Sequence, residues 1–377
     1  MIDLSTLPPM DVAARLGRLR AALDGDADGL LVTKLVNVRW LTGFTGSAGM
    51  ALVTGDRVLL VTDGRYETQA GEQVAAAGLT GDVDIAIGTT AAAQTELLVT
   101  ATNGLGRLAL EAHAITWADQ RRYAEELSPE LVASSGLIDG LRVVKDDGEI
   151  ARIEAAAAIA TEALTRIRGR LWDGLTEADF GLELDTEMRR LGASGPSFET
   201  IVASGPNSAK PHHRPSGRRI GEGDLVVLDF GAKVDGYCSD MTRTVCIGTP
   251  TPEQQRLLDT VAEAQAAGVA AVREGATWRS VDTACRELIG AAGWAEAFSH
   301  GTGHGVGLEI HEDPRLSFAA PEGATLSSRS VVTVEPGVYL AGIGGVRIED
   351  SVVVTDTGCR SLTHAPKDPA WPSPPTT

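Results

Sequence analysis

Five side chains in the C-terminal half of the chain have the types and the spacing of a hydrolytic metal site. Four are carboxylates and one is an imidazole: Asp229, Asp240, His304, Glu335 and Glu349. Such a set suits hard or borderline divalent ions, namely manganese, cobalt, zinc or iron. These ligands are too many for one tetrahedral zinc, but with bridging carboxylates they fit two ions about 3.5–4 Å apart. The residue types therefore predict a site for two divalent metals.

The first carboxylate pair belongs to a predicted β-hairpin. Residues 225–231 and 237–246 are rich in strand-forming residues, and the turn at 233–236 contains an Asp-Gly pair, which is typical of hairpins. Reflection of the chain about the middle of this turn places Asp229 opposite Asp240. Side chains opposed in this way project from the same face, with Cβ atoms roughly 5 Å apart. Two carboxylates that close repel each other unless a cation lies between them.

The second carboxylate pair is predicted in the same way. Residues 331–335 and 345–354 are also strand-like and flank a Gly-rich turn, and reflection about Gly342 places Glu335 opposite Glu349. A single acidic residue in a hairpin is usually a turn or edge residue, so none of these positions indicates a metal site by itself. Two mirrored pairs together with a glycine-flanked histidine form a joint pattern that chance seldom assembles.

Longer segments around these residues resemble the pita-bread metallopeptidases, and within them the Xaa-Pro branch that contains prolidase and aminopeptidase P. The segments are residues 196–215, 223–244, 300–317 and 333–354 and, with a weaker resemblance, residues 37–49 and 59–70. The resemblance implies a creatinase-like α/β N-terminal domain and an α+β pita-bread catalytic domain. It also implies a hydrolase with two divalent ions, preferably manganese, that cleaves proline-containing di- or oligopeptides at the bond before proline.

The resemblance also assigns catalytic roles beyond metal binding. His212, seventeen residues before Asp229, matches a histidine that contacts the scissile region of the substrate. His300 and His311 match two histidines that contact the substrate or support the metal ligands. By the same resemblance, Glu335 transfers a proton toward the leaving nitrogen in addition to binding metal.

Arg347 and His213 complete the sequence-based interpretation of the site. Arg347 precedes Glu349 by two residues, so strand alternation places both on one face. This pairing resembles an arginine that braces the site in Xaa-Pro peptidases, and it argues against methionine aminopeptidase, whose corresponding segment lacks the arginine. His213 has no counterpart with a role and is expected to be a solvated loop residue.

Three further residues are predicted to contact the substrate. Arg315 lies four residues after His311, where several small prolidases have an arginine associated with the dipeptide carboxylate, so it favours a dipeptidase. Arg39 and Trp40 match the place where related enzymes present a residue of the N-terminal domain to the cleft of the neighbouring subunit. They predict a homodimer, with the alternative that Trp40 belongs to the core.

One departure from the family pattern and several alternatives accompany this interpretation. Arg329-Ser330 stands where the family has Gly-Met, which is expected to alter a surface loop and to leave the metal ligands in place. Aminopeptidase P, acting on longer peptides, is an alternative to a dipeptidase. A creatinase-like hydrolase without metal and a vestigial domain that binds partners are alternatives of other classes. The complete set of five candidate ligands argues against both, and metal analysis distinguishes them.

Composition and charge limit the remaining possibilities. A chain of 377 residues with 43% hydrophobic residues is long enough for two domains with sizeable cores. The net charge of -18 and the pI near 4.8 argue against nucleic acid or an anionic membrane as a partner. Four cysteines without a CxxC pair indicate reduced thiols. Because the sequence has no signal pattern and no long apolar run, a soluble, cytoplasmic protein is expected.

The order of predicted elements indicates where the chain divides. Strands are expected at 29–33, 50–54 and 57–62, and helices at 10–24, from about 147, from a capping box at 251–254 to near 275, and at 278–291. The polar segment 141–150 lies between the α/β pattern and the long helix. It predicts an N-terminal domain at 1–141, a catalytic domain at 142–365 and a Pro-rich, disordered tail at 366–377.

Overall fold

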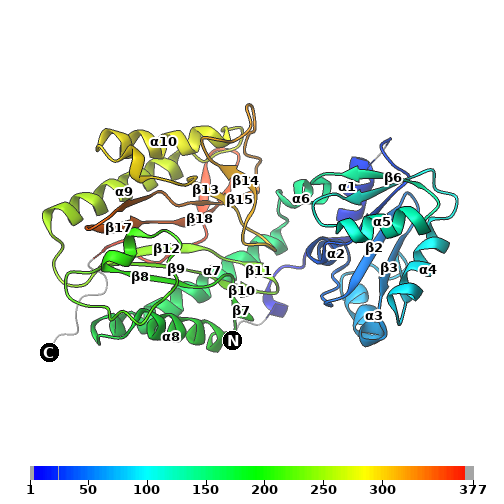
Figure 1. Ribbon diagram of the computed structural model, residues 1–377, viewed down its shortest axis with the longest axis horizontal. Coiled ribbons are helices and arrows are strands. Elements are labelled where there is room, and N and C mark those ends of the chain that lie inside the picture. Colours follow the sequence, from blue (N-terminus) through cyan, green and yellow to red (C-terminus); the bar gives the residue numbers. More distant parts are fainter. Residues whose placement is uncertain (1–3, 24, 370–377) are drawn as a thin grey trace. The chain divides into compact units, whose positions relative to one another are not determined.

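The computed structural model describes residues 4–23 and 25–369, which divide into two compact units (Figure 1). The N-terminal unit spans residues 10–142. The C-terminal unit contains residues 143–369 together with residues 4–9. The division lies one residue after the predicted boundary, and residues 4–9 belong to the C-terminal unit, whereas the sequence predicts them in the N-terminal domain.

The N-terminal unit is built on one six-stranded sheet with the order β4-β3-β2-β1-β5-β6. Its strands are β1 (Gly29–Val32), β2 (Gly49–Thr54), β3 (Val58–Thr62), β4 (Val83–Ile87), β5 (Arg107–Glu111) and β6 (Glu130–Ser134). Its helices are α1 (Val12–Leu23), α2 (Leu35–Thr42), α3 (Glu67–Ala76), α4 (Ala91–Thr102), α5 (Trp117–Glu126) and α6 (Leu137–Arg142). Apolar side chains of the sheet and of α4 and α5 share one core, including Leu31, Val61, Leu98, Leu110 and Tyr123. The α/β architecture predicted for this part of the chain is confirmed.

Trp40 belongs to the core of the N-terminal unit, so the prediction that it reaches a neighbouring subunit is wrong. Its side chain on α2 is fully buried. The guanidinium carbons of Arg15 and Arg18 lie 5.0 Å and 5.2 Å from the centre of its ring, within the range of cation–π attraction. A large ring that is enclosed in this way contributes to folding and cannot contact a second chain. Arg39 is partly exposed, so the predicted contact with the cleft of a neighbouring subunit now depends on this residue alone.

The C-terminal unit consists of sheets with two pairs of helices on the outside (Figure 1). The helices are α7 (Asp147–Ile167), α8 (Glu177–Arg190), α9 (Pro252–Ala271) and α10 (Trp278–Ala291). The strands are β7 (Gly195–Pro196), β8 (Ile201–Ser204), β9 (Leu225–Phe230), β10 (Ala232–Val234), β11 (Tyr237–Cys238), β12 (Met241–Cys246), β13 (Gly303–Gly305), β14 (Glu312–Leu316), β15 (Val331–Val334), β16 (Gly337–Leu340), β17 (Gly344–Arg347), β18 (Asp350–Val354) and β19 (Cys359–Ser361). They form sheets with the orders β12-β9-β8, β14-β13-β15-β18-β19, β11-β10-β7 and β16-β17.

Each helix pair forms its own core with the strands next to it. The core under α7 and α8 includes Ile159, Leu164, Phe180, Leu184, Val226 and Leu228. The core under α9 and α10 includes Leu257, Val261, Val281, Ile289, Val332 and Val352. The sheets therefore lie between two helical layers, and the strands that carry the candidate ligands are held from both sides.

The helices of the C-terminal unit begin where capping residues predict. Thr251 and Gln254 form the predicted capping box, and Pro252 is the first residue of α9. Asp146 and Glu149 form a second capping box at the start of α7.

Within residues 4–23 and 25–369, no helix is both long enough and apolar enough to span a membrane.

The first hairpin has a shorter turn than the prediction assumed. Val234 pairs with Tyr237, so the turn consists of two residues, Asp235 and Gly236. Their φ angles are 44° and 76°. Two positive φ angles at an Asp-Gly pair are typical of the type I′ turn, whose twist matches that of paired strands. The centre of the hairpin therefore lies one residue later than predicted.

This shift changes the partner of Asp229. Asp229 lies opposite Thr242, so the predicted position opposite Asp240 is wrong. Asp240 precedes Thr242 by two residues, which places it diagonally across from Asp229 and, by the alternation of strands, on the same face. The two carboxylates still face the same space.

The second hairpin has the predicted register. Val334 pairs with Asp350 in one ladder, and Gly337 pairs with Arg347 in the next. The same register runs through both ladders, so the intervening Glu335 and Glu349 lie across from each other, as predicted.

The beginning of the C-terminal tail is ordered, so the prediction of a disordered tail is wrong for residues 366–369. The carbonyl of Pro366 accepts a hydrogen bond from Arg243 Nε at 3.1 Å, and the carbonyl of Pro369 accepts one from the Cys246 amide at 3.0 Å. Lys367 donates to Gln265 at 2.8 Å. Proline-rich chain can pack here because its carbonyls meet donors that are already part of the sheet. Residues 370–377 lie outside the described residues.

Candidate metal centre

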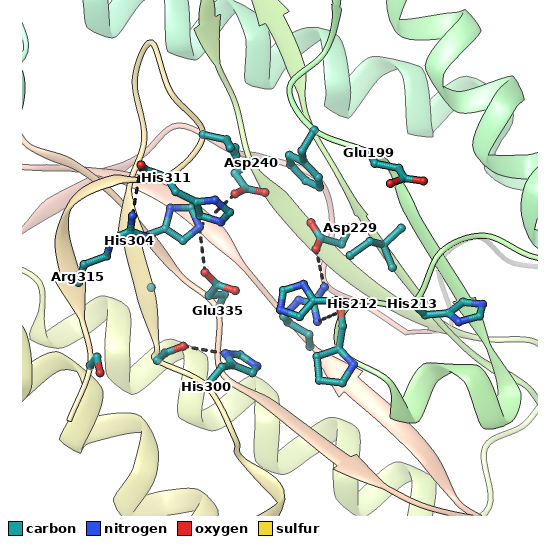
Figure 2. Close-up of a pocket in the computed structure, with 18 of the residues that line it drawn as sticks. Glu199, His212, His213, Asp229, Asp240, His300, His304, His311, Arg315 and Glu335 are labelled. Carbon is teal, nitrogen blue, oxygen red and sulfur yellow. Dashed lines mark hydrogen bonds and ion pairs between the residues drawn. The ribbon is translucent and has the colours of Figure 1, made fainter. Parts of the chain in front are cut away.

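The five candidate ligands come from strands or strand ends in both hairpins and from β13. Asp229 lies on β9, and Asp240 directly precedes β12. His304 is the middle residue of β13, whereas Glu335 follows β15 and Glu349 precedes β18. Four of them, all except Glu349, line a cavity of about 570 Å³. Figure 2 shows that their side chains point toward this common space.

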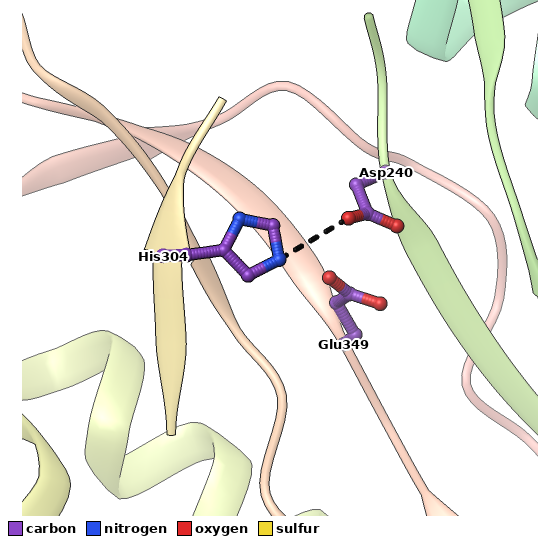
Figure 3. A group of neighbouring side chains, drawn as sticks. All are labelled: Asp240, His304 and Glu349. Atoms are coloured by element: carbon purple, nitrogen blue, oxygen red, sulfur yellow. Dashed lines mark ion pairs between the residues drawn. The ribbon is translucent and has the colours of Figure 1, made fainter. Parts of the chain in front are cut away.

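Asp240, His304 and Glu349 form the tightest group (Figure 3). One nitrogen or oxygen atom of each lies within 4.8 Å of those of the other two, and all three residues are buried. His304 Nε2 lies 3.5 Å from Asp240 Oδ2 and 3.3 Å from Glu335 Oε1. His304 Nδ1 donates to the carbonyl of Gly305 at 3.0 Å, which leaves Nε2 without a proton and facing the carboxylates.

Two buried oxygen atoms, on two of the five candidate ligands, show that these residues fit a cation. Asp229 Oδ2 accepts from Arg347 at 2.5 Å, and Glu349 Oε2 accepts from Thr242 at 2.7 Å. The second oxygen of each carboxylate, Asp229 Oδ1 and Glu349 Oε1, is buried and has no hydrogen-bond partner among the described residues. A buried acceptor without a donor is costly, and a coordinated metal removes this cost. The residues present therefore fit divalent metal ions.

The charges in the group support the same conclusion. Burial and the nearby carboxylate of Glu349 raise the pKa of Asp240 well above its usual range, and burial together with Glu335 raises that of Glu349. Burial raises the pKa of Glu335 to about 7. Burial lowers the pKa of His304 to about 3, so its imidazole is neutral and can act as a ligand. Crowded acids around a neutral imidazole are stabilised when a cation lies between them.

Metal binding is expected to release protons, and more of them at about pH 6 than at about pH 8. In the metal-free protein the raised pKa of about 7 keeps Glu335 largely protonated below neutrality, and this proton must leave when a cation binds nearby. Calorimetric titration with Mn²⁺ in buffers of different ionisation enthalpy measures the number released. Glu335→Gln should remove part of the pH dependence. Equal proton release at both pH values would contradict the expectation.

Arg347 has the predicted bracing position but a different partner. Strand alternation suggested Glu349, whereas its guanidinium contacts Asp229 at 2.5 Å. It also donates to Tyr339 Oη at 2.7 Å and to Thr242 Oγ1 at 3.0 Å. The strand that contains Arg347 ends at this residue, and Glu349 lies in the link before β18, so the alternation of a single strand did not determine the partner.

Thr242 and Tyr339 were not identified from the sequence. The Thr242 hydroxyl donates to Glu349 and accepts from Arg347, and so connects one candidate ligand to the bracing arginine. Tyr339 Oη accepts from Arg347 and lies 2.9 Å from His300 Nε2. Thr242 had a recognisable signal, since it follows Asp240 by two residues and thus shares its strand face. Tyr339 had none in the pattern of the chain.

The predicted histidines lie at the cavity, in different environments. His212, His300 and His311 all line it. The ring of His311 packs edge-on against that of His304, with 4.4 Å between ring centres. Burial lowers the pKa of His300 to about 4 and also lowers that of His311. Because Tyr339 can donate to His300 Nε2 and Nδ1 contacts the Gly301 carbonyl at 2.8 Å, His300 is held in place as a neutral ring.

His213 is not the solvated loop residue that was expected. Its Nε2 lies 2.9 Å from Glu177 Oε2, and its side chain is 13% exposed whereas that of Glu177 is fully buried. The partner lies 36 residues away in the sequence, and the local pattern contains no sign of it.

Two arginines that line the cavity are exposed to solvent, Arg315 and Arg214. Arg315 is half exposed; it donates to the His311 carbonyl at 3.4 Å and lies 4.0 Å from Asp313. Arg214 is 82% exposed and forms an ion pair with Glu199 at 3.3 Å. Both guanidinium groups therefore have donors for an anionic ligand, and Arg315 is the one whose residue pairs with His304 across β13 and β14.

Arg329 connects the substituted loop to the start of α7. Its φ angle is 69°, in the region that favours glycine, which is the residue that the family has here. Its side chain donates to the Lys145 carbonyl at 2.7 Å and to Asp147 at 2.5 Å. The loop is thus at the surface, as predicted, and is tied to residues 145–147.

Comparison with known proteins identifies the family. Residues 151–356 match metallopeptidase family M24, and residues 15–144 match the creatinase/prolidase N-terminal domain. The chain belongs to metallopeptidase family M24, and its C-terminal unit has the pita-bread fold that the sequence predicted. It is therefore a peptidase of a family whose members use divalent metal.

Individual relatives match over nearly the whole chain. An uncharacterized peptidase of Bacillus subtilis is 42% identical over 342 residues, which cover 90% of this chain and 95% of that protein. The structure of an Xaa-Pro dipeptidase from Bacillus anthracis is 38% identical, with a TM-score of 0.90, and the match covers 95% of this chain and 99% of that chain. An X-Pro aminopeptidase from Thermotoga maritima is 34% identical, with a TM-score of 0.85 and coverage of 94% and 99%.

Proposed function

We propose that this protein is an Xaa-Pro dipeptidase that uses two divalent ions to hydrolyse the bond before proline. The observation that carries the proposal is the Asp240–His304–Glu349 group beside a cavity that also contains Arg315. The volume of about 570 Å³ lies in the range typical of small-ligand sites. The relatives support the substrate class, since one solved structure is named an Xaa-Pro dipeptidase and another an X-Pro aminopeptidase.

The proposed metal site holds two ions through Asp229, Asp240, His304, Glu335 and Glu349. Manganese is the preferred candidate because four of the five ligands are hard carboxylates, and cobalt, zinc and iron are compatible with the same set. Divalent ions bound here supply Lewis acidity and lower the pKa of a water molecule toward neutrality. Arg347 orients Asp229 and Thr242 orients Glu349, so that each carboxylate presents its second oxygen to the centre.

The chain's own residues then have distinct tasks. The proline nitrogen leaves as a secondary amine, so it needs a proton, and Glu335 beside the cavity is placed to deliver one through its carboxyl oxygen. His212 and His311 line the same cavity and can donate to the oxygen that gains negative charge in the transition state. His300, fixed by Tyr339, lines the cavity near them. An Xaa-Pro bond has no N–H, so recognition depends on the shape of the cavity and on its charges.

Arg315 is proposed to bind the free carboxylate of a dipeptide. A guanidinium with unused donors is the natural bidentate partner of a carboxylate. Arg315 is the candidate because it pairs with His304 across β13 and β14, next to the proposed ligands. A positive charge on the residue that faces His304 across the two strands favours substrates that end in a free carboxylate there. This arrangement supports a dipeptidase over aminopeptidase P, which acts on longer peptides.

Arg315→Met is expected to raise the Michaelis constant for Xaa-Pro dipeptides by roughly 10- to 100-fold, because a charge-assisted pair contributes about 1.5–3 kcal/mol. Tripeptides, whose carboxylate lies farther out, should be affected much less. Arg214→Met is the matched control at the same cavity and should change neither class strongly. Steady-state kinetics on both substrate classes tests this. An equal loss for dipeptides and tripeptides, or a strong preference of the parent protein for tripeptides, would make aminopeptidase P the better proposal.

The alternatives of other classes are less well supported. A creatinase-like hydrolase without metal and a vestigial domain that binds partners do not require buried carboxylate oxygens without donors, such as Asp229 Oδ1 and Glu349 Oε1. Metal analysis of the purified protein, followed by assays of Xaa-Pro dipeptides with and without chelation, distinguishes them from the proposal. The homodimer stays a prediction that now rests on Arg39, since Trp40 is buried within its own unit.

A further inference from the structure

The carboxylate of Glu177, in the first turn of α8, accepts an unusual number of hydrogen bonds. Its side chain is fully buried. Oε1 accepts from the amide and hydroxyl of Ser204, at 2.8 Å and 2.7 Å, and from Asn207 at 3.0 Å. Oε2 accepts from the amide and hydroxyl of Ser216, at 3.1 Å and 2.6 Å, and contacts His213 at 2.9 Å.

These donors keep the buried carboxylate charged. Burial alone would raise the pKa of Glu177, but hydrogen bonds from Ser216, Ser204 and Asn207 outweigh burial and lower it to about 2. The group is therefore an anion at every pH at which the protein is expected to work. A fixed anion that aligns several donors restrains them more tightly than a neutral acceptor can.

All of the donors belong to one segment, residues 204–216, called the histidine segment below. They lie at its two ends, Ser204 and Ser216, and between them at Asn207 and His213. On its other side the segment is held by Arg347, which donates to the Pro211 carbonyl at 3.2 Å. The segment is thus fixed between a buried anion and the arginine that orients Asp229.

His212 lies between these two attachments. It follows Pro211, whose carbonyl is bound by Arg347, and precedes His213, whose ring is bound by Glu177. Both histidines line the cavity, and Figure 2 shows the His213 ring farther from His304 and Glu335 than the His212 ring is. Anchoring of His213 by Glu177 fixes the backbone from which His212 reaches the cavity.

We propose that Glu177 is a positioning residue that places His212 for catalysis by aligning the histidine segment. Glu177 is not one of the residues that line the cavity. It acts through Ser204, His213 and Ser216. The proposal rests on the proposed function in one respect, namely that His212 contributes to hydrolysis. It assigns a role to a residue outside the metal centre and 35 residues before His212.

The test uses Glu177→Gln, which keeps the shape of the side chain, removes the charge and turns one amide nitrogen toward donors. Hydrogen exchange of the full-length protein should become faster in the histidine segment, while metal content stays unchanged. Turnover should fall by roughly 10- to 100-fold with a small change in the Michaelis constant. The control is Glu183→Gln on the same helix. The Glu183 carboxylate pairs with Arg170 at 3.2 Å, outside the histidine segment, so this variant should change neither hydrogen exchange nor turnover.

A double-mutant cycle separates positioning from general stabilisation. In the parent protein His212→Ala should cost roughly 10²–10³ in turnover. In the Glu177→Gln background the same substitution should cost less than about tenfold, because His212 is already misplaced. Additive losses, or unchanged exchange in the histidine segment, would overturn the proposal.

Two further variants keep the test decisive. If Glu177→Gln fails to fold, His213→Ala and Ser216→Ala each remove one group that contacts the carboxylate and are put through the same exchange measurement and the same cycle. If the parent protein does not hydrolyse Xaa-Pro peptides, the proposed function fails. The exchange measurement and the ¹⁵N signals of His212 in Glu177→Gln then still decide whether Glu177 positions that residue.

Discussion

Asp240→Ala is expected to remove metal binding and to reduce Xaa-Pro hydrolysis by several orders of magnitude. Asp240 is part of the group in which atoms of His304 and Glu349 lie within 4.8 Å, so its loss opens the centre of the proposed site. Metal content of the purified variant and turnover with added Mn²⁺ measure the effect. Asp259→Ala is a suitable control, since Asp259 is exposed on α9 and bonds to Gln255.

The stability of the metal-free variant distinguishes loss of a ligand from loss of the fold. Burial and neighbouring carboxylates raise the pKa of Asp240, so in the metal-free protein this residue is held against repulsion. Its removal should therefore leave the thermal midpoint of the metal-free protein unchanged or higher, and abolish the increase that Mn²⁺ causes in the parent. A variant with near-normal turnover would contradict the two-metal assignment.

His212→Ala and His311→Ala are each expected to lower turnover by roughly 10²–10³, the usual cost of removing one donor to a developing oxyanion. Both side chains line the cavity, and the His311 ring centre lies 4.4 Å from that of His304. Metal content should stay at the level of the parent protein, because neither residue belongs to the Asp240–His304–Glu349 group.

His364→Ala is the control for these two variants, since His364 is exposed in the same unit. Turnover and metal content should both be unaffected by it. Loss of metal, instead of rate alone, in His212→Ala or His311→Ala would reassign that histidine as a ligand. A raised Michaelis constant with normal turnover would assign that histidine to substrate binding.

Much of the fold followed from local patterns in the chain. Strands alternating with helices predicted the α/β N-terminal part, a polar break predicted the start of α7, and a capping box predicted the helix that begins at Pro252. The Gly-rich turn centred on Gly342 predicted that Glu335 and Glu349 lie across from each other. Such features depend on residues close together in the sequence, where turn chemistry and periodicity act directly.

The errors arose where a choice depended on geometry that the pattern leaves open. The Asp-Gly hairpin accepts a turn of two or four residues, and the two-residue turn placed Thr242 rather than Asp240 opposite Asp229. Trp40 could belong to the core or to an interface, and its cation–π contacts with Arg15 and Arg18 accompany complete burial.

By itself, the sequence determined which residue types can bind metal and which of them share a strand face. Only the tertiary structure decided their partners: Arg347 with Asp229, Thr242 between Arg347 and Glu349, and His213 with Glu177. The physical reason is that side chains alternate along a strand with a period of two residues, so the sequence shows on which face of the strand each side chain lies. The side chain that a residue meets across that face is set by the packing of segments far apart in the chain.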